Sequence, residues 1–96
     1  MLFVATCTDR PDSMAKRLAS RPAHLAYLAS LGARVKIGGA LLTPDQSSVV
    51  GSLIVFECES EDEVAALLAR DPYALAGLFA SVDVKPWRQA IGAPLA

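Results

Sequence analysis

The strongest constraint on the fold is the order in which strand-like and helix-like segments alternate along only 96 residues. Two apolar runs, LFVATC and LIVFEC, are each followed by turn residues and then by a stretch with helical spacing. The pattern predicts strands at 2–8, 33–42, 49–59 and 78–85 and helices at 13–31 and 60–70. This βαββαβ order predicts an α+β, ferredoxin-like fold, with an antiparallel sheet and both helices on one face.

The ends of the first helix are marked by short polar residues and a glycine. Asp12 or Ser13 is expected to cap its start, and Gly32 is expected to close it. Pro22 lies inside the pattern and predicts either a kink or the start of a second helical piece. The second helix begins with a capping box formed by Ser60 and Glu63.

The segment between the two helices contains two strands and a turn. Val35 and Ile37 alternate with polar neighbours and are expected on one face of the sheet. Gly38 and Gly39 interrupt this strand, which indicates a bulge, a strand end or the close approach of another group, and Gly39 is expected to line a substrate pocket. The TPDQSS segment, residues 43–48, has the composition of a turn.

Apolar composition predicts self-association. Hydrophobic residues make up 53% of the chain, more than a small monomer buries easily. In LFVATC and LIVFEC both faces of the strand are apolar, although the helices are expected to cover only one of them. We therefore expect a homodimer formed by two sheets packed face to face, built from a single domain over residues 1–96 with an irregular tail from about residue 88.

Charge and motif content argue against several classes of protein. The net charge of −1 gives no electrostatic footprint for nucleic acid, and no apolar stretch approaches the ~20 residues that span a membrane. There is no Rossmann or Walker fingerprint and no cluster of metal ligands, so neither a cofactor nor a metal is expected. Cys7 and Cys58 are predicted to be free, buried thiols, and a cytoplasmic protein is the simplest interpretation.

His24 is the only histidine and the best indication of chemistry. Arg17, Arg21 and His24 follow i, i+4, i+7 spacing, so a continuous helix places them on one stripe, which Leu28 extends toward the core. This pattern predicts a pocket at the sheet edge with an apolar floor and basic groups at its mouth. The alternative is that the arginines are solvated and His24 is a half-buried structural residue.

Asp71 is the predicted partner of His24. It falls seven residues after Val64, on the inward side of the second helix. Its carboxylate is expected to accept a hydrogen bond from one ring nitrogen of His24, which fixes the tautomer and increases the basicity of the other nitrogen. Asp71 can instead cap a short turn that has Pro72 at its first position, and the two roles are compatible.

Three segments of the chain resemble the YciI-like (YCII-related) protein family. They are DSMAKRLASRPAHLAYL at residues 12–28, GGALL at 38–42 and DPYALAGLFASVDVKPW at 71–87. RPAHL and DPY in this order are fairly specific, and the resemblance extends over nearly the whole chain.

The resemblance implies a dimeric α/β barrel with an active site centred on a histidine–aspartate pair, here His24 and Asp71. Arg17, Arg21 and Tyr73 match motif positions that line the same pocket. One relative is a dehydrochlorinase of a chlorinated hydroxyhydroquinone, and the wider barrel group includes muconolactone isomerases and cofactor-free monooxygenases.

These observations together predict a cofactor-free lyase or isomerase acting on a small anionic or hydroxylated cyclic substrate. His24 is expected to transfer the proton and Asp71 to orient it, while Arg21, with Arg17 second, holds a substrate oxygen. The alternative is a non-catalytic dimeric module that binds a small ligand and serves a regulatory or accessory role.

Overall fold

The computed structural model of the chain describes residues 1–95 and has the predicted order of elements. The strands and helices are β1 (Leu2–Asp9), α1 (Met14–Ser30), β2 (Val35–Leu42), β3 (Val49–Glu57), α2 (Glu61–Ala69), α3 (Pro72–Leu75) and β4 (Phe79–Pro86). A single 3₁₀ turn, Gly32–Arg34, joins α1 to β2. The α+β, ferredoxin-like prediction is confirmed.

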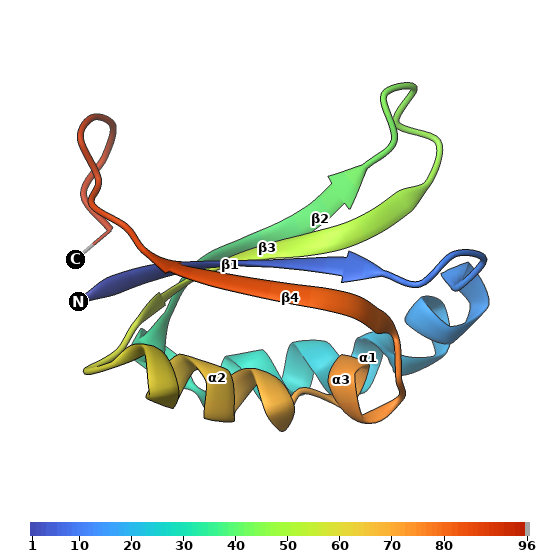
Figure 1. Cartoon of the computed structure of the whole chain (residues 1–96), viewed down its shortest axis with the longest axis horizontal. Helices are drawn as coiled ribbons and strands as arrows, with labels where there is room; N and C mark the ends of the chain where they lie inside the picture. Colours follow the sequence, from blue (N-terminus) through green and yellow to red (C-terminus); the bar gives the residue numbers. More distant parts are fainter. Residues whose placement is uncertain (96) are drawn as a thin grey trace.

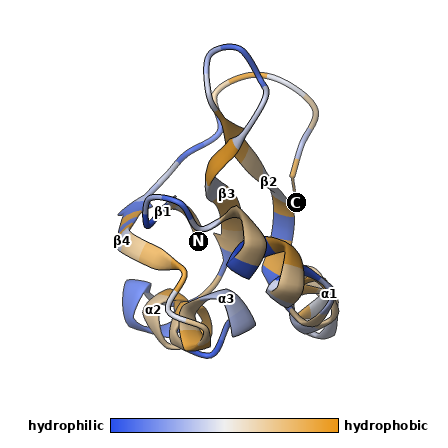
Figure 2. Cartoon of the chain, turned by 90° about the vertical axis from the view of Figure 1, so that its right-hand side faces the viewer, coloured by the Kyte–Doolittle hydropathy of each residue, from blue (hydrophilic) through white to orange (hydrophobic). Residues whose placement is uncertain are grey.

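The four strands form one antiparallel sheet in the order β2-β3-β1-β4. All three helices lie on one side of it, and the other side is not covered by helices (Figure 1). Seen from its end, the molecule has α1 below β2 and α2 below β4 (Figure 2). The edge strands are therefore β2 and β4, each with a different helix beneath it.

Helix α1 is one continuous element that contains Pro22, so of the two alternatives expected at this proline the start of a second piece is wrong. The predicted side-chain cap is also wrong. Ser13 occupies the N-cap position, but its ψ of 12° is not extended and its hydroxyl donates to the carbonyl of Pro11 at 3.3 Å instead. Asp12 has a positive φ of 55° and does not cap the helix. Gly32, with φ of 59°, follows the helix end as predicted.

The second helical region is divided in two. At the start of α2, the Ser60 hydroxyl accepts the Glu63 amide at 3.2 Å, as the capping box predicts. The chain leaves α2 after Ala69, and Asp71 then caps α3 by accepting the Tyr73 amide at 2.9 Å. Asp71 therefore belongs to the start of α3 and not to the inward side of α2, contrary to the prediction.

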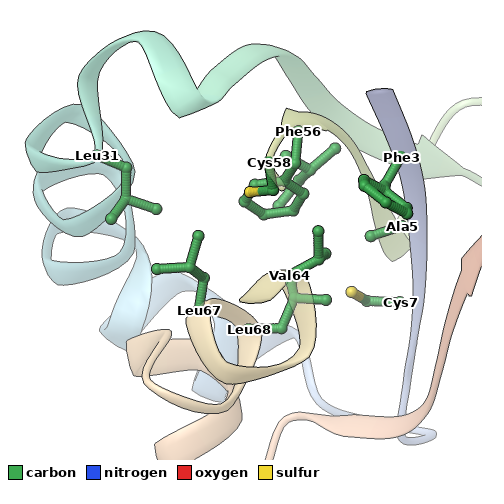
Figure 3. Packing of buried hydrophobic residues seen from close by; sticks show 10 residues of the cluster. Phe3, Ala5, Cys7, Leu31, Phe56, Cys58, Val64, Leu67 and Leu68 are labelled. Atoms are coloured by element: carbon green, nitrogen blue, oxygen red, sulfur yellow. The ribbon is translucent and has the colours of Figure 1, made fainter. Parts of the chain in front are cut away.

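The hydrophobic core lies between the helices and the inner face of the sheet. Figure 3 shows how side chains of β1, β3 and α2 meet there, with Leu31 reaching in from the end of α1. Complete burial of one such Phe, Leu or Val contributes roughly 1.5–3 kcal/mol. The cluster comprises Phe3, Ala5, Cys7, Leu31, Ile54, Phe56, Cys58, Val64, Leu67 and Leu68.

The opposite side of the sheet, which we call the outer face, is apolar at its centre and charged at one edge. On β4 the outer positions are polar and include Asp83 and Lys85, which form an exposed ion pair at 2.9 Å. The strand register places the following apolar residues on the outer face: Leu2, Val4, Ile37, Leu41, Leu53 and Val55. Ile37 remains 49% exposed. Among residues 1–95, no helix is long and apolar enough to cross a membrane.

Strand β2 departs from regular alternation at its start. Val35 pairs with Phe56, whereas Ile37 pairs with Val55, so Lys36 is an extra residue in a β-bulge. The bulge places Val35 on the inner face and Ile37 on the outer face, which corrects the prediction that they share a face. Of the three explanations expected for the two glycines, a bulge and a strand end are wrong, because Gly38 and Gly39 lie in regular register with Ile54 and Leu53 inside β2.

Candidate active site

His24 and Asp71 meet as a buried pair between α1 and α3. Nδ1 of His24 lies 2.8 Å from Oδ1 and 2.9 Å from Oδ2 of Asp71. Because an ionised carboxylate only accepts hydrogen bonds, Nδ1 carries the proton in this contact. Asp71 is completely buried and His24 is 7% exposed. The predicted hydrogen bond is present, together with the capping role that was its alternative.

The second ring nitrogen of His24 faces a cavity. Nε2 has no hydrogen-bond partner within residues 1–95. Every buried polar side-chain atom in that part of the chain does have a partner, so Nε2 is not a buried atom. Nε2 is therefore accessible, and His24 is one of the residues that line a cavity of about 110 Å³. A neutral imidazole that donates through Nδ1 has a free lone pair on Nε2 and can accept a proton there.

Three side chains are stacked beside the cavity. The ring of Tyr73 lies parallel to that of His24, with centroids 3.8 Å apart and planes 13° apart. The guanidinium carbon of Arg17 lies 4.7 Å from the centroid of the same tyrosine ring. Burial raises the pKa of Tyr73, although the positive charges of Arg17 and Arg21 oppose this shift.

Arg17 is held by a buried network that sequence reasoning missed. Its Nε and Nη2 donate to the two oxygens of Asp9 at 2.7 and 3.0 Å, and Nη2 also donates to the hydroxyl of Ser52 at 2.8 Å. Burial alone would lower the pKa of Arg17, but the hydrogen bond and charge of Asp9 outweigh it and raise that pKa. In the sequence, Asp9 is only the polar residue that follows the first predicted strand.

The same network changes the expected role of Arg17. The prediction placed Arg17 with Arg21 at the mouth of the pocket, but Arg17 is only 6% exposed and bonded to Asp9 and Ser52. Arg21, one helical turn further on, is exposed and lines the cavity. Arg21 is thus the cation available to an entering ligand.

The cavity lies beneath edge strand β2, as the spacing on α1 predicted. One wall is a stripe of α1, the other is formed by small residues of β2, and the floor comes from β3 and Tyr73. Gly38 and Ala40 face it from the inner side of β2, whereas Gly39, which was expected to line it, borders it only through its backbone because a Cβ atom there would point to the outer face. The complete lining is Arg17, Arg21, His24, Leu25, Leu28, Gly38, Gly39, Ala40, Ser52, Ile54 and Tyr73.

Other candidates lie away from this cavity. The hydroxyl of Tyr27 donates to the carbonyl of Leu67 at 2.6 Å, so it is occupied elsewhere. A more open groove of about 590 Å³ runs along the end of the sheet beside Trp87, and one of about 530 Å³ lies between α2 and β4. Both are larger, but neither contains a histidine or a buried carboxylate.

The two cysteines are free thiols on the helix side of the sheet. Burial, followed by the charges of Asp71 and Asp9, raises the pKa of Cys7 to about 12. Burial also raises the pKa of Cys58 to about 11. Both thiols are therefore protonated near neutral pH. In the described part of the chain, no group of three or more histidine, cysteine, aspartate or glutamate side chains is placed to hold a metal ion.

Solved structures share this architecture. The 5-chloro-2-hydroxyhydroquinone dehydrochlorinase (TftG) from Burkholderia phenoliruptrix, in complex with 2,5-dihydroxybenzoquinone, is 39% identical. It aligns with a TM-score of 0.85 over 94% of this chain and 96% of its own. SnoaB, a cofactor-independent oxygenase from Streptomyces nogalater, aligns with a TM-score of 0.58 at 17% identity over 96% of both chains, which shows a shared fold.

Sequence comparison gives the same grouping. Protein YciI of Escherichia coli is 37% identical over 93% of this chain and 98% of its own length. The model of the YCII-related domain matches residues 1–88, which include the His24–Asp71 pair and every residue that lines the cavity. The chain therefore belongs to the YCII-related domain family.

Proposed function

We propose that this protein is a cofactor-free lyase or isomerase that uses His24 and Asp71 for proton transfer on a small hydroxylated or anionic ring. The observation that carries the proposal is the asymmetry of the imidazole. Both oxygens of a fully buried carboxylate bind Nδ1, and Nε2 has no partner among the described residues although its ring lines the cavity. This is the arrangement that a general base requires.

In the proposed reaction, Nε2 removes a proton from a C–H or O–H group of the substrate. In a lyase, the electron pair left behind forms a double bond and expels an anion such as chloride. In an isomerase, it shifts a double bond and the imidazolium returns the proton to another atom of the ring. Asp71 stabilises the imidazolium in both cases, and proton transfer of this kind contributes ~10²–10⁴-fold to the rate.

The remaining lining supports a ligand that is flat and carries an anionic oxygen. Arg21 is an exposed cation that lines the same cavity as His24, where it can bind a phenolate, enolate or carboxylate oxygen. Leu25, Leu28 and Ile54 supply apolar surface for a ring. The similarity to a dehydrochlorinase with a bound dihydroxybenzoquinone supports the same class of substrate here.

We also propose that the protein is a cytoplasmic homodimer joined through the outer face of the sheet. Of the six apolar residues there, Val55 is buried in a single chain, the other five are at least partly exposed, and Ile37 is half exposed. A contiguous apolar surface of this kind is normally covered in a soluble protein. Two free cysteines in the described part of the chain are typical of a reducing compartment.

The test is chloride release from 5-chloro-2-hydroxyhydroquinone, followed by screening of hydroxylated aromatic compounds and lactones. His24→Gln and Asp71→Asn are expected to lower kcat by about 10²–10⁴-fold, because the first removes the base and the second its orienting carboxylate. Asp62→Asn, on the exposed first turn of α2, is the matched control and is expected to retain activity.

Nitrogen NMR of the imidazole provides a second readout. The wild-type ring is expected to carry its proton on Nδ1, and Asp71→Asn to lose that preference while the protein stays folded. Turnover that survives in His24→Gln contradicts the proposal. Ligand binding without turnover by the wild type on the whole panel favours the non-catalytic module.

A further inference from the structure

We infer that Gly38 sets the size of the ligand, so that the site admits a single six-membered ring and rejects a fused pair. The inference rests on the proposed ligand pocket and adds a specificity residue to it. Gly38 pairs with Ile54, whose side chain points to the inner face and lines the cavity. A Cβ atom built on Gly38 lies 3.6 Å from Cγ1 of Ile54, on that same inner face.

The cavity lies between α1 and β2, and the lining residues of β2 are two glycines and an alanine, which have almost no side chains. The inner positions of β2 opposite His24 are Gly38 and Ala40, in register with Ile54 and Ser52. The resulting volume is about 110 Å³. For comparison, a closed protein cavity of about 150 Å³ holds one benzene molecule. A single ring with its polar substituents at the mouth beside Arg21 is close to this volume, and a fused pair of rings exceeds it.

A methyl group at position 38 fits the protein but occupies the space of the ligand. Its nearest neighbours, the side chain of Ile54 and the carbonyl of Leu53, would be at 3.6 Å, which is ordinary van der Waals contact. Gly38→Ala is therefore expected to fold normally, with a melting temperature at or above that of the wild type, since alanine is better than glycine in a strand.

The neighbouring glycine provides a matched control. Gly39 pairs with Leu53, so a Cβ atom there points to the outer face and meets nothing within 4 Å. Gly39→Ala makes the same chemical change one residue away, with the methyl group directed away from the cavity. A comparison of the two variants thus separates loss of ligand space from a general effect on the strand.

The experiment measures binding of 2,5-dihydroxybenzoquinone and of the bicyclic 2-hydroxy-1,4-naphthoquinone, with the imidazole signals of His24 as the NMR readout. We expect wild type and Gly39→Ala to bind the monocyclic ligand equally and the bicyclic one at least about tenfold more weakly. Gly38→Ala is expected to lose about tenfold or more in affinity for the monocyclic ligand, because its methyl group overlaps the ring.

Three results would overturn the inference: equal affinity of Gly38→Ala and wild type for the single ring, equal binding of both ligands by the wild type, or failure of the single ring to perturb His24. These results differ from a failure of the proposed function. If the size dependence is found but no substrate is turned over, the catalytic proposal fails and the assignment of Gly38 stands.

Discussion

The carboxylate of Asp71 connects local backbone structure to the candidate chemistry. Oδ1 accepts the amide of Tyr73 and, with Oδ2, binds Nδ1 of His24. The ring of Tyr73 then stacks on the imidazole that the same carboxylate orients. One buried side chain thus fixes the position of α3, the tyrosine ring and the histidine, so all three respond together to a change at residue 71.

The buried pair of Asp9 and Arg17 is expected to be a major source of stability at the level of single residues. Asp9→Ala leaves the guanidinium of Arg17 buried without its partner, and such a loss costs roughly 3–5 kcal/mol of unfolding free energy. Urea denaturation measures it. Asp83→Ala, which breaks the exposed ion pair with Lys85, is the control and is expected to cause no measurable loss. Equal effects of the two substitutions would contradict this interpretation.

At the residue scale, the sequence was enough to predict the His24–Asp71 pair but not the residues that surround it. The spacing of Arg17, Arg21 and His24 is a property of one helix, so it placed all three on one stripe correctly. The contact between Arg17 and Asp9 depends on how β1 and α1 meet across a turn, which no periodicity records. Arg17 therefore looked like a free cation when it is already neutralised.

At the scale of elements, the β-bulge at Lys36 explains why strand alternation does not predict which of the two glycines faces the cavity. Strand alternation with period two, counted from Val35, would place Gly38 on the outer face. The extra residue in the bulge shifts the count by one, so Gly38 shares the inner face with Val35 and lines the cavity. A bulge leaves little trace in the sequence, whereas the strand itself was recognisable from its β-branched residues.

The loop between β2 and β3 contains a carboxylate with a strongly lowered pKa. The hydroxyl of Thr43 donates to Asp45 at 2.6 Å, and with the amide and hydroxyl of Ser47 it lowers the pKa of Asp45 from 3.8 to about 2. Since the native pKa is below the ordinary value, the stabilising effect is present above pH 3.8 and is lost as the pH falls toward 2.

Replacement of the threonine tests this assignment. Thr43→Val is expected to raise the pKa of Asp45 toward 3.8, because the largest cause of the shift is removed. Carboxyl carbon NMR measured between pH 5 and 2 gives the pKa directly. Thr6→Val, on the outer face of β1, is the control and is expected to leave that pKa unchanged. A wild-type Asp45 that titrates at its ordinary value would show that the loop does not form these hydrogen bonds in solution.

At the scale of the whole molecule, we expect a dimer. Light scattering at micromolar concentration is expected to give about twice the 10.1 kDa of one chain. Ile37→Lys places a charge on the outer face, on edge strand β2, and is expected to give a folded monomer, because Ile37 is already half exposed in a single chain. Leu75→Lys, on α3 away from the outer face, is the control and is expected to remain dimeric. A monomeric wild type would exclude the proposed assembly.

The overall architecture was the most predictable level, because the order of elements alone determines it. Six segments in βαββαβ order leave few ways to form an antiparallel sheet with helices on one side. The division of the second helical region at Asp71 was foreseen only as an alternative, since the capping of a four-residue helix depends on one side chain.

Successive residues of β2 point to opposite sides of a sheet that is one layer thick. Gly38 borders the space in which a ligand would react, and Gly39 borders the surface on which a second subunit would rest. In the proposed dimer, ligand preference and subunit contact depend on neighbouring residues of β2, so the two can diverge independently during evolution. Under the two proposals, a single small substitution at Gly38 would change the preferred ring size and leave the subunit contact intact.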